Sequence, residues 1–192
     1  MPVENKHPCF ILVNPQMGEN IGASARGMWN FGIDRMRIVS PRDGWPNQKA
    51  VVMASGAGRL LDEALIFQNF TDAIADQHFI FATTARPRDL IKPMYSPEEA
   101  VELAYDKISK GQNVGFAFGP ERSGLENSDI IKANAIVSVP VNEQFPSLNL
   151  AQCVLLLAYE WMLKSTNPGS DKSTLEDSDM VAVMKVEKLS QY

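Results

Sequence analysis

Three loops in this sequence place glycine or proline beside side chains that could bind or activate a ligand. The first is residues 14–26, which contains Asn20 and Gly22 and ends on Arg26. Glycine lets the backbone approach a ligand closely, and the N-terminus of a following helix favours an anion. The alternative is a plain strand-to-helix turn with a surface arginine. Taken alone, the segment is more typical of the plain turn.

The second loop, residues 118–125, places Glu121 and Arg122 between Gly119 and Gly124. It follows an apolar run, and in open α/β sheets ligands bind beyond the carboxyl ends of the strands. Proline and glycine make it poor material for a helix or a strand, so a bound ligand would explain it. A rigid turn with a surface Glu–Arg pair is the alternative.

The third loop begins at Val139 and leads into a long apolar helix. Pro140 and Pro146 restrict its shape, and either Ser147 or Asn149 begins the helix. Both residue types are good helix caps. Each of the two could therefore be a cap with no ligand bound to it.

The elements that must position these loops follow from the apolar pattern. Short runs rich in Val, Ile or Phe predict strands buried on both faces. They cover 9–13, 36–39, 79–83, 114–118 and 135–139. Helical patterns cover 20–31, 97–110 and 149–164, and the second begins on a capping box formed by Ser96 and Glu99. We therefore expect an α/β fold: a mainly parallel sheet with helices on both faces.

The length of 192 residues allows one well-buried core, for which we expect residues 1–165. Residues 166–192 are predicted to be a polar linker and the start of a possible C-terminal extension. The sequence shows no membrane span and no signal peptide, so a cytoplasmic protein is expected. We expect Cys9 and Cys153 to be buried thiols, not a disulfide. His7 and His78 lack metal-ligand spacing, so we expect no metal.

The net charge of −5 argues mildly against a nucleic-acid partner, because phosphate binders are usually basic. A local cluster can nevertheless bind RNA on an acidic protein. Six arginines lie in or near the expected loops: Arg26, Arg35, Arg37, Arg42, Arg86 and Arg88. Ordinary solvated charges are the alternative interpretation of these side chains.

Taken together and in this order, the three loops resemble the SpoU family of SPOUT-class RNA 2′-O-methyltransferases. The first loop matches the family motif Asn-x-Gly-x-x-x-Arg through Asn20, Gly22 and Arg26, and the second matches Phe-Gly-x-Glu-x-x-Gly-Leu. The third matches Pro…Ser-Leu-Asn. Each motif alone is weak, but three in order, spanning roughly residues 10–164, are specific.

Residues 14–28, 81–86 and 147–152 are similar to the TrmJ-like tRNA (cytidine/uridine-2′-O-)-methyltransferases. That resemblance implies methylation of the pyrimidine at tRNA position 32, at the start of the anticodon loop. Most of the C-terminal extension that this subfamily often carries is absent from the sequence.

The family resemblance also implies a trefoil knot in the C-terminal half and a homodimer with active sites at its interface. The methyl donor would be S-adenosylmethionine. The residues that the resemblance assigns to the donor are Thr83, Thr84, Ala85, Gly119, Val139, Pro146, Ser147 and Leu148.

The catalytic set implied by the resemblance is Arg26, Asn20, Glu121, Ser147 and Asn149. A guanidinium stays protonated at neutral pH, so Arg26 is a poor general base. We expect it to grip an RNA phosphate and stabilise developing oxyanion charge. Glu121 would orient Arg26 or take the proton, and Asn20 and Asn149 would position groups around the reacting oxygen.

Three alternatives remain open at this stage. A SpoU-type rRNA methyltransferase would carry the same motifs, and so would a catalytically silent RNA-binding homologue. A dinucleotide-binding Rossmann domain is disfavoured, because no Gly-x-Gly-x-x-Gly follows the first strand.

Overall fold

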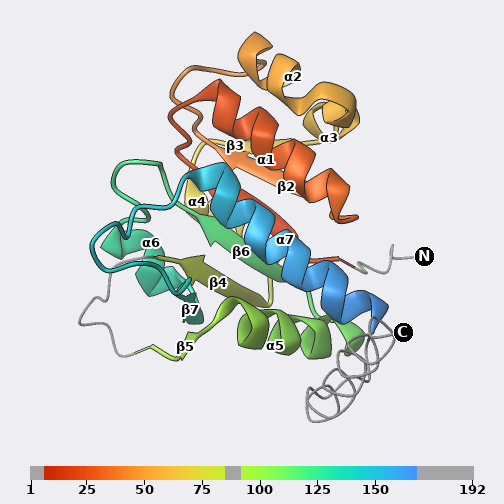
Figure 1. The fold of residues 1–192 in the computed structure, drawn as a ribbon, viewed down its shortest axis with the longest axis vertical. Coiled ribbons are helices and arrows are strands. Elements are labelled where there is room, and N and C mark those ends of the chain that lie inside the picture. The colour runs from red at the N-terminus through yellow and green to blue at the C-terminus, as the bar shows by residue number, and fades with distance from the viewer. Residues whose placement is uncertain (1–6, 85–91, 168–192) are drawn as a thin grey trace, which may run out of the picture.

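The computed structural model describes residues 7–84 and 92–167. Seven strands form one parallel sheet in the order β3-β2-β1-β6-β4-β7-β5 (Figure 1). The strands are β1 Cys9–Val13, β2 Arg35–Val39, β3 Leu65–Phe67, β4 Phe79–Thr83, β5 Met94–Tyr95, β6 Val114–Phe118 and β7 Ala135–Val137. The predicted parallel α/β sheet is confirmed. The short edge strands β3 and β5 were not predicted, and β7 ends at Val137 instead of Val139.

Helices cover both faces of the sheet, as predicted. They are α1 Gly18–Asn30, α2 Gln48–Ala54, α3 Gly58–Asp62, α4 Phe70–Ala73, α5 Pro97–Ser109, α6 Asn127–Lys132 and α7 Leu150–Thr166, with a 3₁₀ turn η1 at Ser55–Ala57. The helices α1, α2, α3, α5 and α7 pack on the face that carries Phe10 and Leu12. The opposite face, with Ile11 and Val13, is covered by α4 and α6. Burial on both faces explains the continuous apolar runs of the central strands.

The N-termini of α5 and α7 lie at the predicted capping residues. Ser96 and Glu99 form the expected capping box at the start of α5. Asn149 caps α7 and forms a second capping box with Gln152. The structure therefore identifies Asn149, not Ser147, as the residue that begins this helix.

Gly22 serves helix packing and not the close approach of a ligand, which corrects the interpretation of the first loop. A Cβ atom at Gly22 would lie 2.1 Å from the backbone oxygen of Ala50 and 2.9 Å from the backbone nitrogen of Ala54. Both contacts are far shorter than atoms allow. Any side chain at position 22 would therefore push α2 away from α1.

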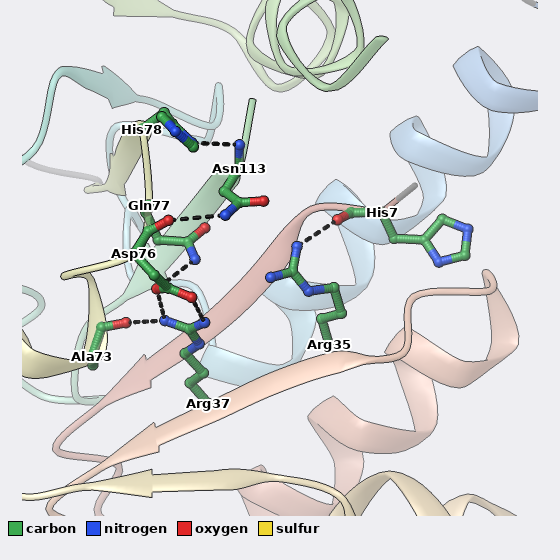
Figure 2. Close-up of polar contacts among 8 residues, drawn as sticks. All are labelled: His7, Arg35, Arg37, Ala73, Asp76, Gln77, His78 and Asn113. Atoms are coloured by element: carbon green, nitrogen blue, oxygen red, sulfur yellow. Dashed lines mark hydrogen bonds and ion pairs between the residues drawn. The ribbon is translucent and has the colours of Figure 1, made fainter. Parts of the chain in front are cut away.

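Arg37 is the middle residue of β2 and is buried (Figure 2). Its guanidinium donates to both carboxylate oxygens of Asp76 and to the backbone oxygen of Ala73. It also stacks over the ring of Phe67. The alternatives of RNA contact and solvated charge are both wrong for this arginine, because its donors are used inside the fold.

Two more of the six arginines, Arg35 and Arg42, have partners within the described residues. Arg35 donates to the backbone oxygen of His7 (Figure 2). Arg42 pairs with Asp43 on the surface. His78 is exposed, and its ring accepts a hydrogen bond from the backbone nitrogen of Asn113. Arg86 and Arg88 lie outside the described residues.

Among the described helices, none is long and apolar enough to cross a membrane. The trefoil knot stays a prediction. Most of the expected linker, residues 168–192, lies outside the described residues, and α7 itself extends through Thr166.

Replacing Asp76 with Asn should destabilise the fold, because it leaves the charge of Arg37, which is 5% exposed, without an anion. We expect a loss of about 2 kcal/mol, below the value of about 3–5 kcal/mol for fully buried pairs, because the Asp76 side chain is 55% exposed. Urea unfolding at pH 7 measures this loss. Asp106→Asn, which breaks a surface pair with Lys110, is the matched control and should cost under about 1 kcal/mol.

The loss should also depend on pH in a defined direction. Hydrogen bonds from Arg37 hold the pKa of Asp76 well below its usual value. A carboxyl with a depressed pKa stabilises the fold above its unfolded pKa, and this contribution disappears as pH falls below about 4. The difference in stability between wild type and Asp76→Asn should therefore shrink steadily as pH falls from about 4 towards the depressed pKa of Asp76, and should vanish only below that pKa. A constant difference across that range would contradict the assignment.

Candidate active site

A pocket opens at the carboxyl ends of β4, β6 and β7, where two of the three loops meet. Its lining residues are Thr83, Thr84, Phe118, Gly119, Pro120, Glu121, Arg122, Ser123, Gly124, Val137, Val139, Val141, Pro146, Ser147, Leu148, Leu150 and Cys153. The walls come from three strand ends, the second and third loops and the first turn of α7. This is the edge at which ligands bind in open α/β sheets.

The pocket gathers most of the residues that the sequence motifs singled out. Seven of the eight residues assigned to a methyl donor line it: Thr83, Thr84, Gly119, Val139, Pro146, Ser147 and Leu148. The eighth, Ala85, lies outside the described residues. Of the proposed catalytic set, Glu121 and Ser147 line the pocket, whereas Asn20, Arg26 and Asn149 do not.

Glu121 reaches across from the second loop to the beginning of α1. Its carboxylate accepts hydrogen bonds from the backbone nitrogens of Gln16, at 2.8 Å, and Met17, at 3.3 Å. Met17 occupies the cap position of α1 but makes no side-chain cap bond. Glu121 therefore fixes the backbone that leads into α1, and its negative charge lies near the positive end of the helix.

Within this chain Glu121 does not contact Arg26, so the expectation that Glu121 orients Arg26 stays a prediction. The carboxylate of Glu121 instead accepts a 2.7 Å hydrogen bond from the side-chain nitrogen of Asn20. The anion expected at the start of α1 is thus a side chain of the protein itself.

Asn20 continues the contact to the third loop. Its side-chain oxygen accepts a 3.0 Å hydrogen bond from the side-chain nitrogen of Asn149. The side-chain oxygen of Asn149 in turn accepts from the backbone nitrogen of Ala151, at 2.8 Å. One chain of hydrogen bonds, which we call the Glu121–Asn20–Asn149 relay, therefore ties together all three motif loops.

The second loop is tight enough to require glycine at two positions. A Cβ atom at Gly119 would lie 2.1 Å from the backbone nitrogen of Leu125, so position 119 cannot carry a side chain. Gly124 has a φ of +67°, in the region that glycine adopts most readily. Its backbone nitrogen donates to the backbone oxygen of Pro120 and closes the turn. The turn fixes Glu121 at its tip.

Cys153 lines the pocket from α7, a position that the sequence analysis missed. It lies three residues after Leu150, so both face the sheet once Asn149 is known to cap the helix. Burial raises the pKa of its thiol to about 11, against a smaller opposing effect of a hydrogen bond with Thr83. The thiol therefore stays protonated at neutral pH and forms an apolar part of the wall. Both cysteines are free, as expected, but only Cys9 is fully buried, whereas Cys153 is partly buried.

Arg26 lies on the exposed side of α1 and outside the pocket. Its guanidinium makes no hydrogen bond or ion pair with another described residue. The next residue, Gly27, lies against α7, where an added Cβ atom would be 3.2 Å from the Leu155 side chain. Arg26 is therefore free to bind an anion and stands next to the contact of α1 with α7.

A family model described as the SpoU rRNA Methylase family matches residues 8–159. The chain belongs to this SpoU methylase family. It is a methyltransferase, and the motif loops around its pocket are those on which the family resemblance was based.

Two relatives show the range of similarity. The tRNA (cytidine-2′-O-)-methyltransferase TrmJ of Methanocaldococcus jannaschii is 34% identical over 187 residues, which cover 95% of this chain and 79% of that protein. The crystal structure of TrmJ from Z. mobilis ZM4 is 51% identical, with a TM-score of 0.78, and the match covers 81% of this chain and 68% of that one.

The fold is also shared with a more distant protein. The SpoU methyltransferase AviRb of Streptomyces viridochromogenes, solved in complex with its cofactor AdoMet, has a TM-score of 0.66 at 17% identity, covering 86% of this chain and 63% of that one. At this identity the likeness concerns the fold alone.

The relay predicts that Asn20→Asp, although closer in shape to the native residue, should destabilise the fold more than Asn20→Ala. Asn20→Asp would replace the donor facing Glu121 with a second carboxylate oxygen, whereas Asn20→Ala only removes two hydrogen bonds. We expect Asn20→Ala to lower the free energy of unfolding by about 1–3 kcal/mol. Asn20→Asp should cost more at pH 7, because like charges in contact repel.

Thermal unfolding of the two variants at pH 7 measures the effect. Asn30→Ala, at an exposed asparagine in the last turn of the same helix, is the control and should change little. If Asn20→Asp were as stable as wild type, the donor direction of the relay would be wrong.

Proposed function

We propose that this methyltransferase transfers a methyl group from S-adenosylmethionine to the 2′-hydroxyl of a ribose in tRNA. The observation that carries the proposal is the pocket, where residues of the second and third family motifs meet and to which the relay ties the first motif through Asn20. The similarity to proteins named as tRNA 2′-O-methyltransferases supports tRNA as the substrate. We further propose the pyrimidine at position 32 as the target, on the resemblance of the loops to the TrmJ-like enzymes.

The chemical character of the pocket fits this donor. Val137, Val139 and Leu148 form apolar walls suited to an adenine ring. Ser147 adds a hydroxyl that can bind a ribose, and the carboxylate of Glu121 favours a nearby cation. When bound, S-adenosylmethionine supplies an activated methyl group on a positively charged sulfur. The residues proposed to hold it are those named from the motifs, Ala85 included.

Arg26 is proposed to act on the RNA. Its guanidinium would grip the phosphate next to the reacting ribose and stabilise negative charge on the 2′-oxygen as the hydroxyl loses its proton. Because Arg26 does not line the pocket of its own chain, we propose that the partner subunit's Arg26 serves each pocket in a homodimer.

An apolar face on α7 supports the homodimer. Leu155, Leu156, Tyr159 and Leu163 lie on one side of the helix and are exposed. Trp29, near the end of α1, is exposed as well, and α1 packs against α7 (Figure 1). Contiguous exposed apolar side chains of this kind mark interaction surfaces.

Arg26→Ala should abolish methyl transfer, with a loss of at least about 100-fold, and should leave binding of S-adenosylhomocysteine nearly unchanged. Arg26→Lys should also fail badly, because an ammonium keeps the charge but loses the planar fork of donors. The two measurements are tritiated methyl transfer to tRNA and calorimetric titration with S-adenosylhomocysteine. Near-normal turnover in Arg26→Ala would refute the role, and loss of cofactor binding would move Arg26 into the donor site.

Leu156→Glu should convert the homodimer to a monomer and abolish methyl transfer, because it buries a charge in the proposed interface. Val52→Glu, on the exposed side of α2, is the control and should remain dimeric and active. Light scattering at micromolar concentration reports the oligomeric state. A wild type that is monomeric under these conditions would count against the homodimer.

The assay that separates the alternatives compares methyl transfer to total tRNA and to total rRNA. The family model's description names rRNA, so transfer to rRNA alone would replace the proposed substrate. Transfer to neither, together with tight RNA binding, would indicate the catalytically silent homologue. Mapping 2′-O-methylation in tRNA from a deletion strain then tests position 32.

A further inference from the structure

Phe145 is an exposed aromatic residue next to Pro146, which lines the pocket, and it has no role in the proposed binding of the donor. Its side chain is 74% exposed, the largest exposed fraction among the large hydrophobic residues that the structure describes. It belongs to neither of the two hydrophobic clusters. Trp45, which lies in another loop at the same edge of the sheet, packs against the core instead. Trp45 shows that an aromatic side chain in a loop of this fold can be packed against the core, whereas Phe145 is left exposed.

The backbone around Phe145 is ordered by a turn. The backbone nitrogen of Phe145 donates to the backbone oxygen of Asn142, at 2.9 Å, and that of Gln144 donates to the Asn142 side chain, at 3.0 Å. On either side of the turn, Val141 and Pro146 both line the pocket. The ring is therefore presented from a fixed turn whose two ends form the pocket wall.

The base of the nucleotide whose 2′-hydroxyl enters the pocket must lie close to the pocket rim. Proteins that bind single-stranded RNA loops commonly hold such bases by stacking them on aromatic side chains. We propose that Phe145 stacks on the base attached to the ribose that is methylated, and so holds this nucleotide at the pocket. The inference rests on the proposed function.

Stacking on the face of a base has a specific consequence. Methylation takes place on the ribose 2′-oxygen and leaves the base unchanged, so the enzyme needs only to hold the base in place. A ring reads the flat face that all bases share, and not the hydrogen-bonding edge that distinguishes them. Phe145 should therefore contribute to affinity for the RNA and not to the choice between cytidine and uridine.

The test compares variants that keep a ring with one that keeps only apolar volume. Phe145→Tyr and Phe145→Trp should retain methyl transfer, whereas Phe145→Leu should raise the KM for unmodified tRNA about tenfold or more. Binding of S-adenosylhomocysteine should be unchanged in all three variants. Ile131→Ala, which truncates an apolar side chain of 62% exposure on α6, is the control for loss of exposed apolar surface.

Fluorescence quenching measures the contact between the aromatic ring and the RNA directly. Added tRNA should quench the fluorescence of Phe145→Trp more strongly than that of wild type, because a stacked base quenches an indole ring. Light scattering on Phe145→Leu should show the wild-type oligomeric state. A change of oligomeric state would instead place the ring between two copies of the chain and overturn the proposal.

The outcomes separate this inference from the function on which it rests. If wild type methylates tRNA and Phe145→Leu has the same KM as Phe145→Tyr, the stacking role fails and the proposed function stands. If wild type methylates no RNA, the proposed function fails and the inference fails with it.

Discussion

The carboxylate of Glu121 at the start of α1 is the interaction on which the arrangement of the loops depends. A carboxylate accepts hydrogen bonds and donates none, so Asn20 must turn its side-chain nitrogen towards Glu121. The oxygen of Asn20 then faces the nitrogen of Asn149, whose own oxygen is left to cap α7. Each amide has one orientation that satisfies both neighbours. A single acidic side chain thus sets the direction of a network that runs through three loops.

This arrangement changes the meaning of the motif residues. Asn20 and Asn149 match the family motifs, yet neither lines the pocket, and their side chains bind Glu121, each other and the first turn of α7. Gly22 is required by the contact of α1 with α2, and Gly119 by the tight turn that presents Glu121. Part of the family signature therefore describes how the site is built and not which atoms touch a ligand.

Local signals in the sequence predicted the elements well. The strands β1, β4 and β6 have the predicted bounds, because their apolar runs are buried on both faces and end at strong turn residues. The capping box of α5 is likewise readable from four consecutive residues. The residues assigned to the donor by resemblance meet at one pocket, apart from Ala85, because the carboxyl ends of parallel strands share one edge of the sheet.

What the sequence could not predict depends on partners far along the chain. Nothing near Arg37 in the sequence indicates that the fold will place Asp76 beside it. Likewise, nothing near Glu121 indicates that its carboxylate will bind the backbone at the start of α1. The strands β3 and β5 contain three and two residues, too few for a periodic pattern. They become strands only because β2 and β7 offer free edges to pair with.

The strand order also has a consequence for how the protein is made. The central strand β6 inserts between β1 and β4, and Glu121, just beyond it, lies 105 positions after its partner Gln16. At about 5–20 residues per second, a ribosome takes about 5–20 s to synthesise that separation. During this interval one edge of β1 has no strand to pair with, and an unpaired edge is a template for association with other chains. The nascent N-terminal half is therefore the stage at which this fold is most exposed to aggregation and most dependent on chaperones.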